Sequence, residues 1–140
     1  MSNKHLKVRY RDSASKLHKA LGTILKQHPK LRGFRTCQEY RIPHSRYHID
    51  WFILDLSLAI EVHGEQHYKP VRFGGRSEQE ARDAFELQQI ADIEKKNYCR
   101  LNGWRYLAFR YNEKLDAEYV VKKIFDVLKD SNEPSGASAL

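Results

Sequence analysis

The chain has 140 residues, a length that matches one ordinary domain and is too short for two. Apolar residues make up 41% of the chain and charged residues 31%, which is typical of a folded globular protein and argues against general disorder. The net charge of +7 comes from residues 1–50, where lysine and arginine far outnumber the acids. Because basic segments attract a phosphate backbone, nucleic acid is the leading candidate partner.

No apolar stretch approaches the roughly 18 residues that span a bilayer, and the first residues lack the apolar middle segment of a signal peptide. We therefore expect a cytoplasmic protein with no membrane partner. Cys37 and Cys99 lie far apart and form no CxxC pair, so we expect reduced thiols and neither a disulfide framework nor a structural zinc site.

The pattern predicts a basic arm over residues 1–12, a single domain over residues 13–130 and a disordered tail over residues 131–140. The first element of the domain is an amphipathic helix over residues 13–28, because apolar side chains recur there at helical spacing and Pro29 follows.

Three strands are expected next. Residues 34–42 and 47–54 are rich in aromatic and β-branched side chains, and Pro43 separates them. Residues 58–63 have the same character and lie close enough to the second strand to form an antiparallel hairpin with it.

A polar loop then leads to a long helix over residues 77–101, which the pair Asn102-Gly103 ends. Residues 104–110 predict a fourth strand, and Asp116 begins a final helix with one apolar side. The order α-β-β-β-α-β-α predicts an α/β fold in which a mixed sheet is flanked by helices.

The third expected strand carries polar side chains on one face. Alternation along a strand places Glu61 and His63 together, opposite apolar neighbours, and Asp50 lies on the adjacent strand in apolar surroundings. Unpaired charges there would be unfavourable, and a shared cation would satisfy them. Two carboxylates and the Val62 carbonyl oxygen suit Mg²⁺, with Mn²⁺ able to substitute, so we predict a metal site at Asp50, Glu61 and Val62.

A metal at this site would polarise a phosphoryl oxygen and help to form a hydroxide nucleophile. His63 is then placed to orient or deprotonate the attacking water. Gly64 lets the backbone come close, so Gln66 and His67 are expected to converge on the same centre.

These residues carry a family resemblance. Asp50 is followed by the motif EVHGEQHY at residues 61–68, by a helix with Asp92, Lys95 and Lys96, and then by NGW and LAFR. Over residues 13–113 this arrangement resembles the PD-(D/E)XK nuclease superfamily. Within it, the likeness is to very-short-patch repair endonucleases and the phage homing endonucleases related to them.

The resemblance implies a restriction-endonuclease-like fold, with Asp50 as the metal-binding aspartate and Glu61 as the acid of (D/E)XK. It places His63 where many relatives have lysine, and it implies that Asp92 joins the site. Many relatives add an acid from the first helix, where this chain offers His18 and no carboxylate. Whether His18, or Glu39 on the first strand, joins the site stays open.

The predicted function is a Mg²⁺-dependent endonuclease that hydrolyses DNA phosphodiester bonds, with structure-specific or nicking activity. The expected substrate is duplex or branched DNA, with RNA less favoured, and the protein is a monomer or homodimer. A non-catalytic DNA- or RNA-binding module on the same fold is the alternative. The expected nucleic-acid contacts are Lys7, Arg9, Arg11, Arg41, His44, Arg46, Arg72, Arg76, Lys95 and Lys96.

Overall fold

The computed structural model describes residues 16–72 and 74–130; the expected basic arm, the start of the first helix and the expected tail lie outside these residues. Seven main elements follow one another: α1 (Lys16–Gln27), β1 (Thr36–Arg41), β2 (His48–Ile53), β3 (Leu58–His63), α2 (Glu78–Leu101), β4 (Arg105–Arg110) and α3 (Ala117–Asp130). Two 3₁₀ turns, η2 (Leu54–Leu56) and η3 (Glu65–His67), flank β3.

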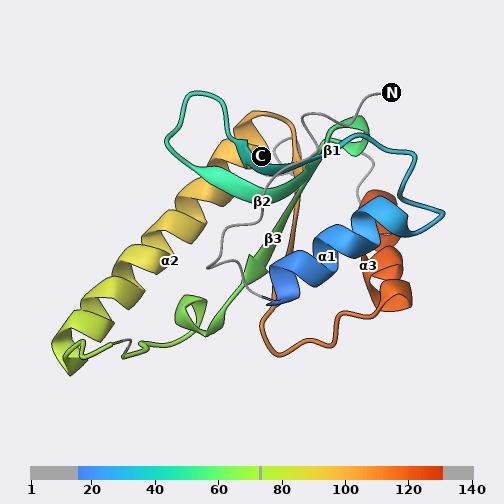
Figure 1. Cartoon of the computed structure of the whole chain (residues 1–140). Helices are drawn as coiled ribbons and strands as arrows, with labels where there is room; N and C mark the ends of the chain where they lie inside the picture. Colours follow the sequence, from blue (N-terminus) through green and yellow to red (C-terminus); the bar gives the residue numbers. More distant parts are fainter. Residues whose placement is uncertain (1–15, 73, 131–140) are drawn as a thin grey trace.

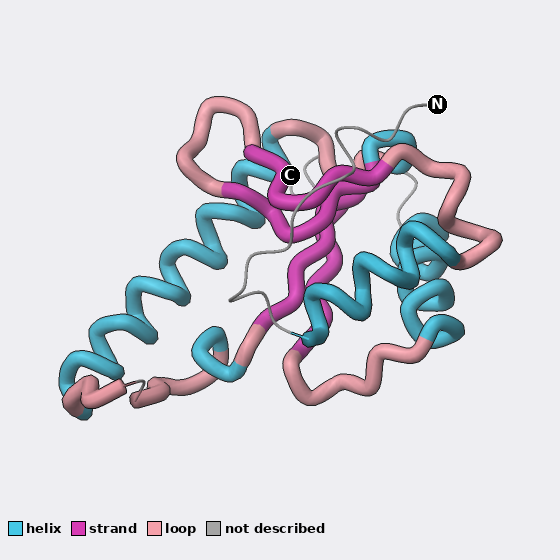
Figure 2. The backbone as a smooth tube through the Cα atoms, in the orientation of Figure 1, coloured by secondary structure: helices cyan, strands magenta, loops and turns pink. Residues whose placement is uncertain are grey.

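The strands form one mixed sheet in the order β1-β2-β3-β4. The first three are antiparallel neighbours, as expected for the β2–β3 hairpin, whereas β3 and β4 run parallel across the α2 connection. Figure 1 shows α2 on one side of the sheet and α1 with α3 on the other, and Figure 2 shows the strands between them. The expected α/β class is confirmed.

Each face of the sheet has its own hydrophobic core. The first core, on the side of α1 and α3, includes Leu21, Trp51, Ile60 and Ile124. The second core, on the side of α2, contains Ile42, Ile49, Phe52, Ala59 and Cys99. Because Ile60 and Ala59 face different cores, the alternation predicted for β3 is confirmed.

The β1–β2 ladder is interrupted in the middle of the sheet. Gln38 pairs with Trp51 and Tyr40 with Ile49, but the intervening Glu39 has a left-handed backbone with φ 52° and is not part of the register. The β2–β3 register likewise stops at Trp51. Asp50 itself is therefore absent from both registers, which leaves its backbone amide available for a side-chain hydrogen bond.

The long helix α2 begins with a capping box at the predicted position. Ser77 accepts a hydrogen bond from the Glu80 amide at 3.1 Å, and the Glu80 carboxylate accepts one from the Ser77 amide at 2.8 Å. These bonds satisfy amides that the first helical turn leaves without partners. Across residues 16–72 and 74–130, no helix combines the length and apolarity that a membrane crossing requires.

Ser77→Ala is expected to lower the free energy of unfolding by about 1 kcal/mol, because it removes the side-chain half of the capping box. Urea unfolding followed by circular dichroism measures the change. The control is Gln89→Ala, at an exposed position of the same helix, which should stay close to the parent. Equal losses in the two variants would contradict the capping role.

Candidate functional site

Asp50 and Glu61 bind each other's strands. The Asp50 amide donates to Glu61 Oε2 at 2.9 Å, and the Val62 amide donates to Asp50 Oδ2 at 2.7 Å. These reciprocal bonds lie where the β2–β3 ladder has ended, so the two carboxylates take the place of backbone carbonyls. The structure thus brings together the two acids that the sequence identified.

Both carboxylate oxygens of Glu61 accept hydrogen bonds from the protein. Its side chain is 2% exposed, and Oε1 accepts a hydrogen bond from Lys95 Nζ at 2.9 Å. Burial, and then the nearby Asp50 charge, raise the pKa of Glu61 to about 7. Burial would lower the pKa of Lys95, but the charge and hydrogen bond of Glu61, together with the charges of Asp50 and Asp92, hold the pKa above its usual value. Lys95, expected at a nucleic-acid surface, instead forms a largely buried ion pair within the site.

The other oxygen of Asp50 faces α1 and the irregular part of β1. His18 Nδ1 lies 3.6 Å from Asp50 Oδ1, and ligand atoms of His18, Glu39 and Asp50 all lie within 4.8 Å of one another. Burial alone would raise the pKa of Asp50, but the interaction with His18 and the hydrogen bond from the Val62 amide hold it below its usual value. Asp50 therefore carries a negative charge in a pocket of potential metal ligands.

Gln38 is the neighbour that orients His18. Its Nε2 lies 2.7 Å from His18 Nε2, while the buried Gln38 Oε1 has no hydrogen-bond partner within the described parts of the chain. A buried amide oxygen without a donor is unusual in a folded protein. The side-chain amide of Gln38 is thus only partly satisfied within the described residues.

His63 is held on both sides by tyrosines. Its Nδ1 lies 3.2 Å from the Tyr68 hydroxyl and its Nε2 lies 3.1 Å from the Tyr106 hydroxyl. Burial, and then the proximity of His67, lower the pKa of His63 to about 4. With both ring nitrogens engaged and the ring neutral, His63 is less well placed to deprotonate water than the sequence suggested.

His67 has the geometry of a base. Its Nδ1 lies 2.8 Å from Asp92 Oδ2, and its ring stacks on His63 with centroids 4.1 Å apart. Burial would raise the pKa of Asp92, but the interactions with His67, together with those of Gln88 and His63, hold the pKa below its usual value. Gln88 Nε2 also donates to Asp92 Oδ1 at 3.0 Å. An ionised Asp92 thus fixes His67 through Nδ1, and we call this pair the His67–Asp92 dyad.

The polar face of α2 looks towards the sheet. On this face Asp92 contacts His67, Lys95 contacts Glu61, and Gln88 donates to Asp92. Their spacing along the helix places the three side chains on one side. The large apolar side chains on the other face are exposed: Leu87 68%, Ile90 53% and Ile93 61%.

The expected nucleic-acid contacts fall into separate groups. Arg41, His44 and Arg46 line one recess at the β1–β2 turn. Arg72 and Arg76 lie in the loop before α2, where Arg72 Nε donates to the Arg76 carbonyl at 3.0 Å. The ammonium of Lys96 lies 5.7 Å from the centroid of the Tyr106 ring. The predicted contacts Lys7, Arg9 and Arg11 lie outside the described residues.

Two contributors were not identified from the sequence. Tyr106 reaches His63 from β4, and Gln38 reaches His18 from β1. Both contacts join residues distant in the chain and depend on the sheet register, so no local motif marks them. The position of Tyr106 within an apolar strand gave only a packing signal.

We found no match to the chain among protein-family models, curated proteins or solved structures. Any function assigned to the chain therefore depends on the residues of the site itself.

The lowered pKa of His63 predicts a loss of stability in acid. The folded state keeps His63 neutral down to about pH 4, whereas the unfolded chain takes up a proton below 6.5. This contribution is therefore present above pH 6.5 and is lost as the pH falls to 4, by at most about 3 kcal/mol. The raised pKa of Glu61 acts in the opposite direction: its contribution to stability is present below pH 4.5 and is lost as the pH rises to 7.

His63→Gln removes the pH-dependent contribution of His63 to the free energy of unfolding and leaves that of Glu61. We therefore expect the parent to lose stability relative to this variant as the pH falls from 6.5 to 4. Urea unfolding at half-unit pH steps gives the difference between the two proteins. His48→Gln, at an exposed strand position, is the control and should show a flat difference. A flat difference for His63→Gln as well would overturn this interpretation of His63.

Proposed function

We propose that the protein is a metal-dependent endonuclease that hydrolyses DNA phosphodiester bonds, on a fold of the restriction-endonuclease type. The observation that carries the proposal is a continuous chain of polar contacts across one end of the sheet. It runs from His18 and Asp50 through Glu61 to His63, and on to the His67–Asp92 dyad. An array of ionised and neutral groups with shifted pKa values is typical of a catalytic centre.

A divalent cation suits the donors around Asp50. The 3.6 Å between His18 Nδ1 and Asp50 Oδ1 is too long for a direct hydrogen bond, but it is short enough for two ligands of one ion. Ligand atoms of His18, Glu39 and Asp50 all lie within 4.8 Å of one another, which is close enough for the three side chains to bind one cation.

His18, Glu39 and Asp50 would hold the metal, for which we expect Mg²⁺ with Mn²⁺ able to substitute. The carboxylate of Glu61 and the carbonyl of Val62, predicted as ligands from the sequence, stay proposals. Both oxygens of Glu61 accept bonds from protein donors, so direct ligation would require Lys95 to move. When bound, such a metal polarises a phosphoryl oxygen and lowers the pKa of a bound water.

The side chains supply the remaining functions. With Nδ1 of His67 fixed by Asp92, its Nε2 is the nitrogen that would accept a proton from the attacking water. Lys95, cationic beside Glu61, would stabilise negative charge that develops on the phosphate. Many members of the suggested family have a lysine at the position of His63. In this chain Lys95 of α2 would supply that ammonium group instead.

Cleavage of supercoiled plasmid in Mg²⁺ tests the chemistry. Asp50→Asn and His67→Gln are each expected to lower the rate at least about 100-fold, because one removes a ligand charge and the other the base. Asp83→Asn, at an exposed position of α2, is the matched control and should cleave at the parental rate. Cleavage without metal, or full activity in both site variants, would contradict the mechanism.

Metal binding has a readout that does not depend on activity. A few millimolar Mn²⁺ is expected to raise the Tm of the parent by about 3 °C or more, because a ligand that binds only the folded state stabilises it. Asp83→Asn should show the same rise, and Asp50→Asn should lose most of it. An equal rise in Asp50→Asn would place the ion away from Asp50.

A specific observation also favours the non-catalytic alternative. The Glu61–Lys95 pair is saturated and nearly inaccessible, as expected of a structural ion pair. Under this alternative, the parent binds nucleic acid but cleaves no duplex, branched, single-stranded or RNA substrate in any metal. Glu61→Gln would then retain parental binding, and Mn²⁺ would leave the Tm unchanged.

A further inference from the structure

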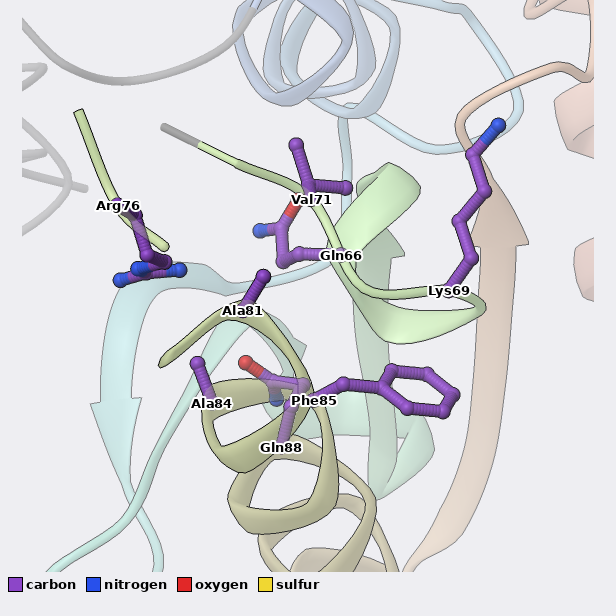
Figure 3. Close-up of a pocket in the computed structure, with 8 residues that line it drawn as sticks. All are labelled: Gln66, Lys69, Val71, Arg76, Ala81, Ala84, Phe85 and Gln88. Atoms are coloured by element: carbon purple, nitrogen blue, oxygen red, sulfur yellow. The ribbon is translucent and has the colours of Figure 1, made fainter. Parts of the chain in front are cut away.

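A recess of about 170 Å³ lies between the η3 segment, the loop that follows it and the first half of α2. Figure 3 shows side chains from all three segments around it, among them Gln66, Val71, Arg76, Ala81, Ala84 and Gln88. A single bound water needs only roughly 10–15 Å³ of such space. The recess therefore has room for a group much larger than an ion or a water molecule.

The recess shares residues with the candidate site. Gln88 lines it and donates through Nε2 to Asp92, and Gln66 belongs to the same 3₁₀ turn as His67. A group held in the recess would consequently lie next to the dyad.

The lining matches the chemistry of a flat heterocycle. In Figure 3 Val71 lies on one side, and the small side chains of Ala81 and Ala84 leave space on the facing helix. The amide of Gln66 and Oε1 of Gln88 approach from opposite sides, which provides hydrogen-bond donors and an acceptor. Nucleobase edges combine donors and acceptors in the same way, and enzymes read extruded bases by such contacts between apolar walls.

Basic residues flank the recess and could contact the sugar-phosphate backbone of a bound nucleotide. Arg76 lines the recess at one end and Lys69, which pairs with Glu65 at 3.1 Å, at the other, and Arg72 contacts the Arg76 carbonyl. The long side chains of Lys69 and Arg72 are exposed. Positive charge around a small polar cavity favours a nucleotide over an uncharged ring.

We propose that this recess binds one unpaired nucleobase of the DNA substrate, so that the protein acts on DNA with a bulged or otherwise extruded nucleotide. The inference rests on the proposed function, because it takes DNA as the substrate. It also explains Gly64: a Cβ there would lie 2.5 Å from Gln66 Oε1, so only glycine lets the Gln66 side chain fold back as it does.

Binding of the full chain to fluorescent DNA hairpins in EDTA tests the proposal without cleavage. One set of hairpins carries a single bulged nucleotide with each of the four bases in turn, and the matched hairpin carries an abasic residue there. We expect the parent to bind at least one base-containing bulge about tenfold more tightly than the abasic bulge, as for one well-packed base. Equal affinity for all five hairpins would overturn the proposal.

Two variants assign the effect to the recess. Ala84→Leu fills it from α2 and is expected to abolish the base-dependent difference while affinity for the abasic hairpin stays the same. Gln89→Leu adds the same bulk at an exposed position of that helix and should keep the difference. A difference that persists in Ala84→Leu would place base recognition elsewhere.

Gly64→Ala is the second route if Ala84→Leu folds poorly. It displaces the flexible end of Gln66 at a residue with an ordinary φ of −72°, so the fold should tolerate it. We expect the base-dependent difference to fall several-fold, and an unchanged difference would exclude Gln66 as a contact. Because these measurements need no metal, base-dependent binding without cleavage would refute the nuclease alone, and cleavage without base dependence would refute only the recess.

Discussion

The reciprocal bonds of Asp50 and Glu61 are the constraint on which the site depends. Each carboxylate accepts an amide of the facing strand at the point where the β2–β3 ladder stops. An apolar replacement of either acid would leave a poorly solvated amide without a partner, at a cost of about 1–3 kcal/mol. The two acids therefore join the strands, and the strands fix the positions of the acids. A substitution of either acid is expected to change both stability and the geometry of the site.

The neighbouring charges follow from that arrangement. Two carboxylates brought together in the interior repel each other, and their environments drive their pKa values apart: burial and then Asp50 raise the pKa of Glu61, whereas hydrogen bonds hold the pKa of Asp50 low. Lys95 compensates Glu61, and His18 faces Asp50. Asp50 thus stays ionised close to His18 and Glu39, which is an electrostatic situation that a bound cation would stabilise.

The sequence predicted what depends on local pattern and missed what depends on register. Alternation placed Glu61 on the α2 side of β3, and Ser77 marked the start of the helix, because side-chain period and capping are local properties. The break at Glu39, by contrast, comes from a left-handed residue in a strand of ordinary composition. Tyr106 reaches His63 only because β4 lies parallel to β3 in one particular register, which no short segment encodes.

The orientation of α2 shows which interaction dominates in this part of the molecule. Burying a large aliphatic side chain contributes about 1.5–3 kcal/mol, yet the helix exposes Leu87 and Ile90 and turns Asp92 and Lys95 towards the sheet. Removing one partner of a buried ion pair such as Glu61–Lys95 costs about 3–5 kcal/mol, so the polar contacts are comparable in size with the burial that rotating the helix would gain. Packing alone would have given the opposite rotation, and departures of this kind concentrate where a protein maintains a functional site.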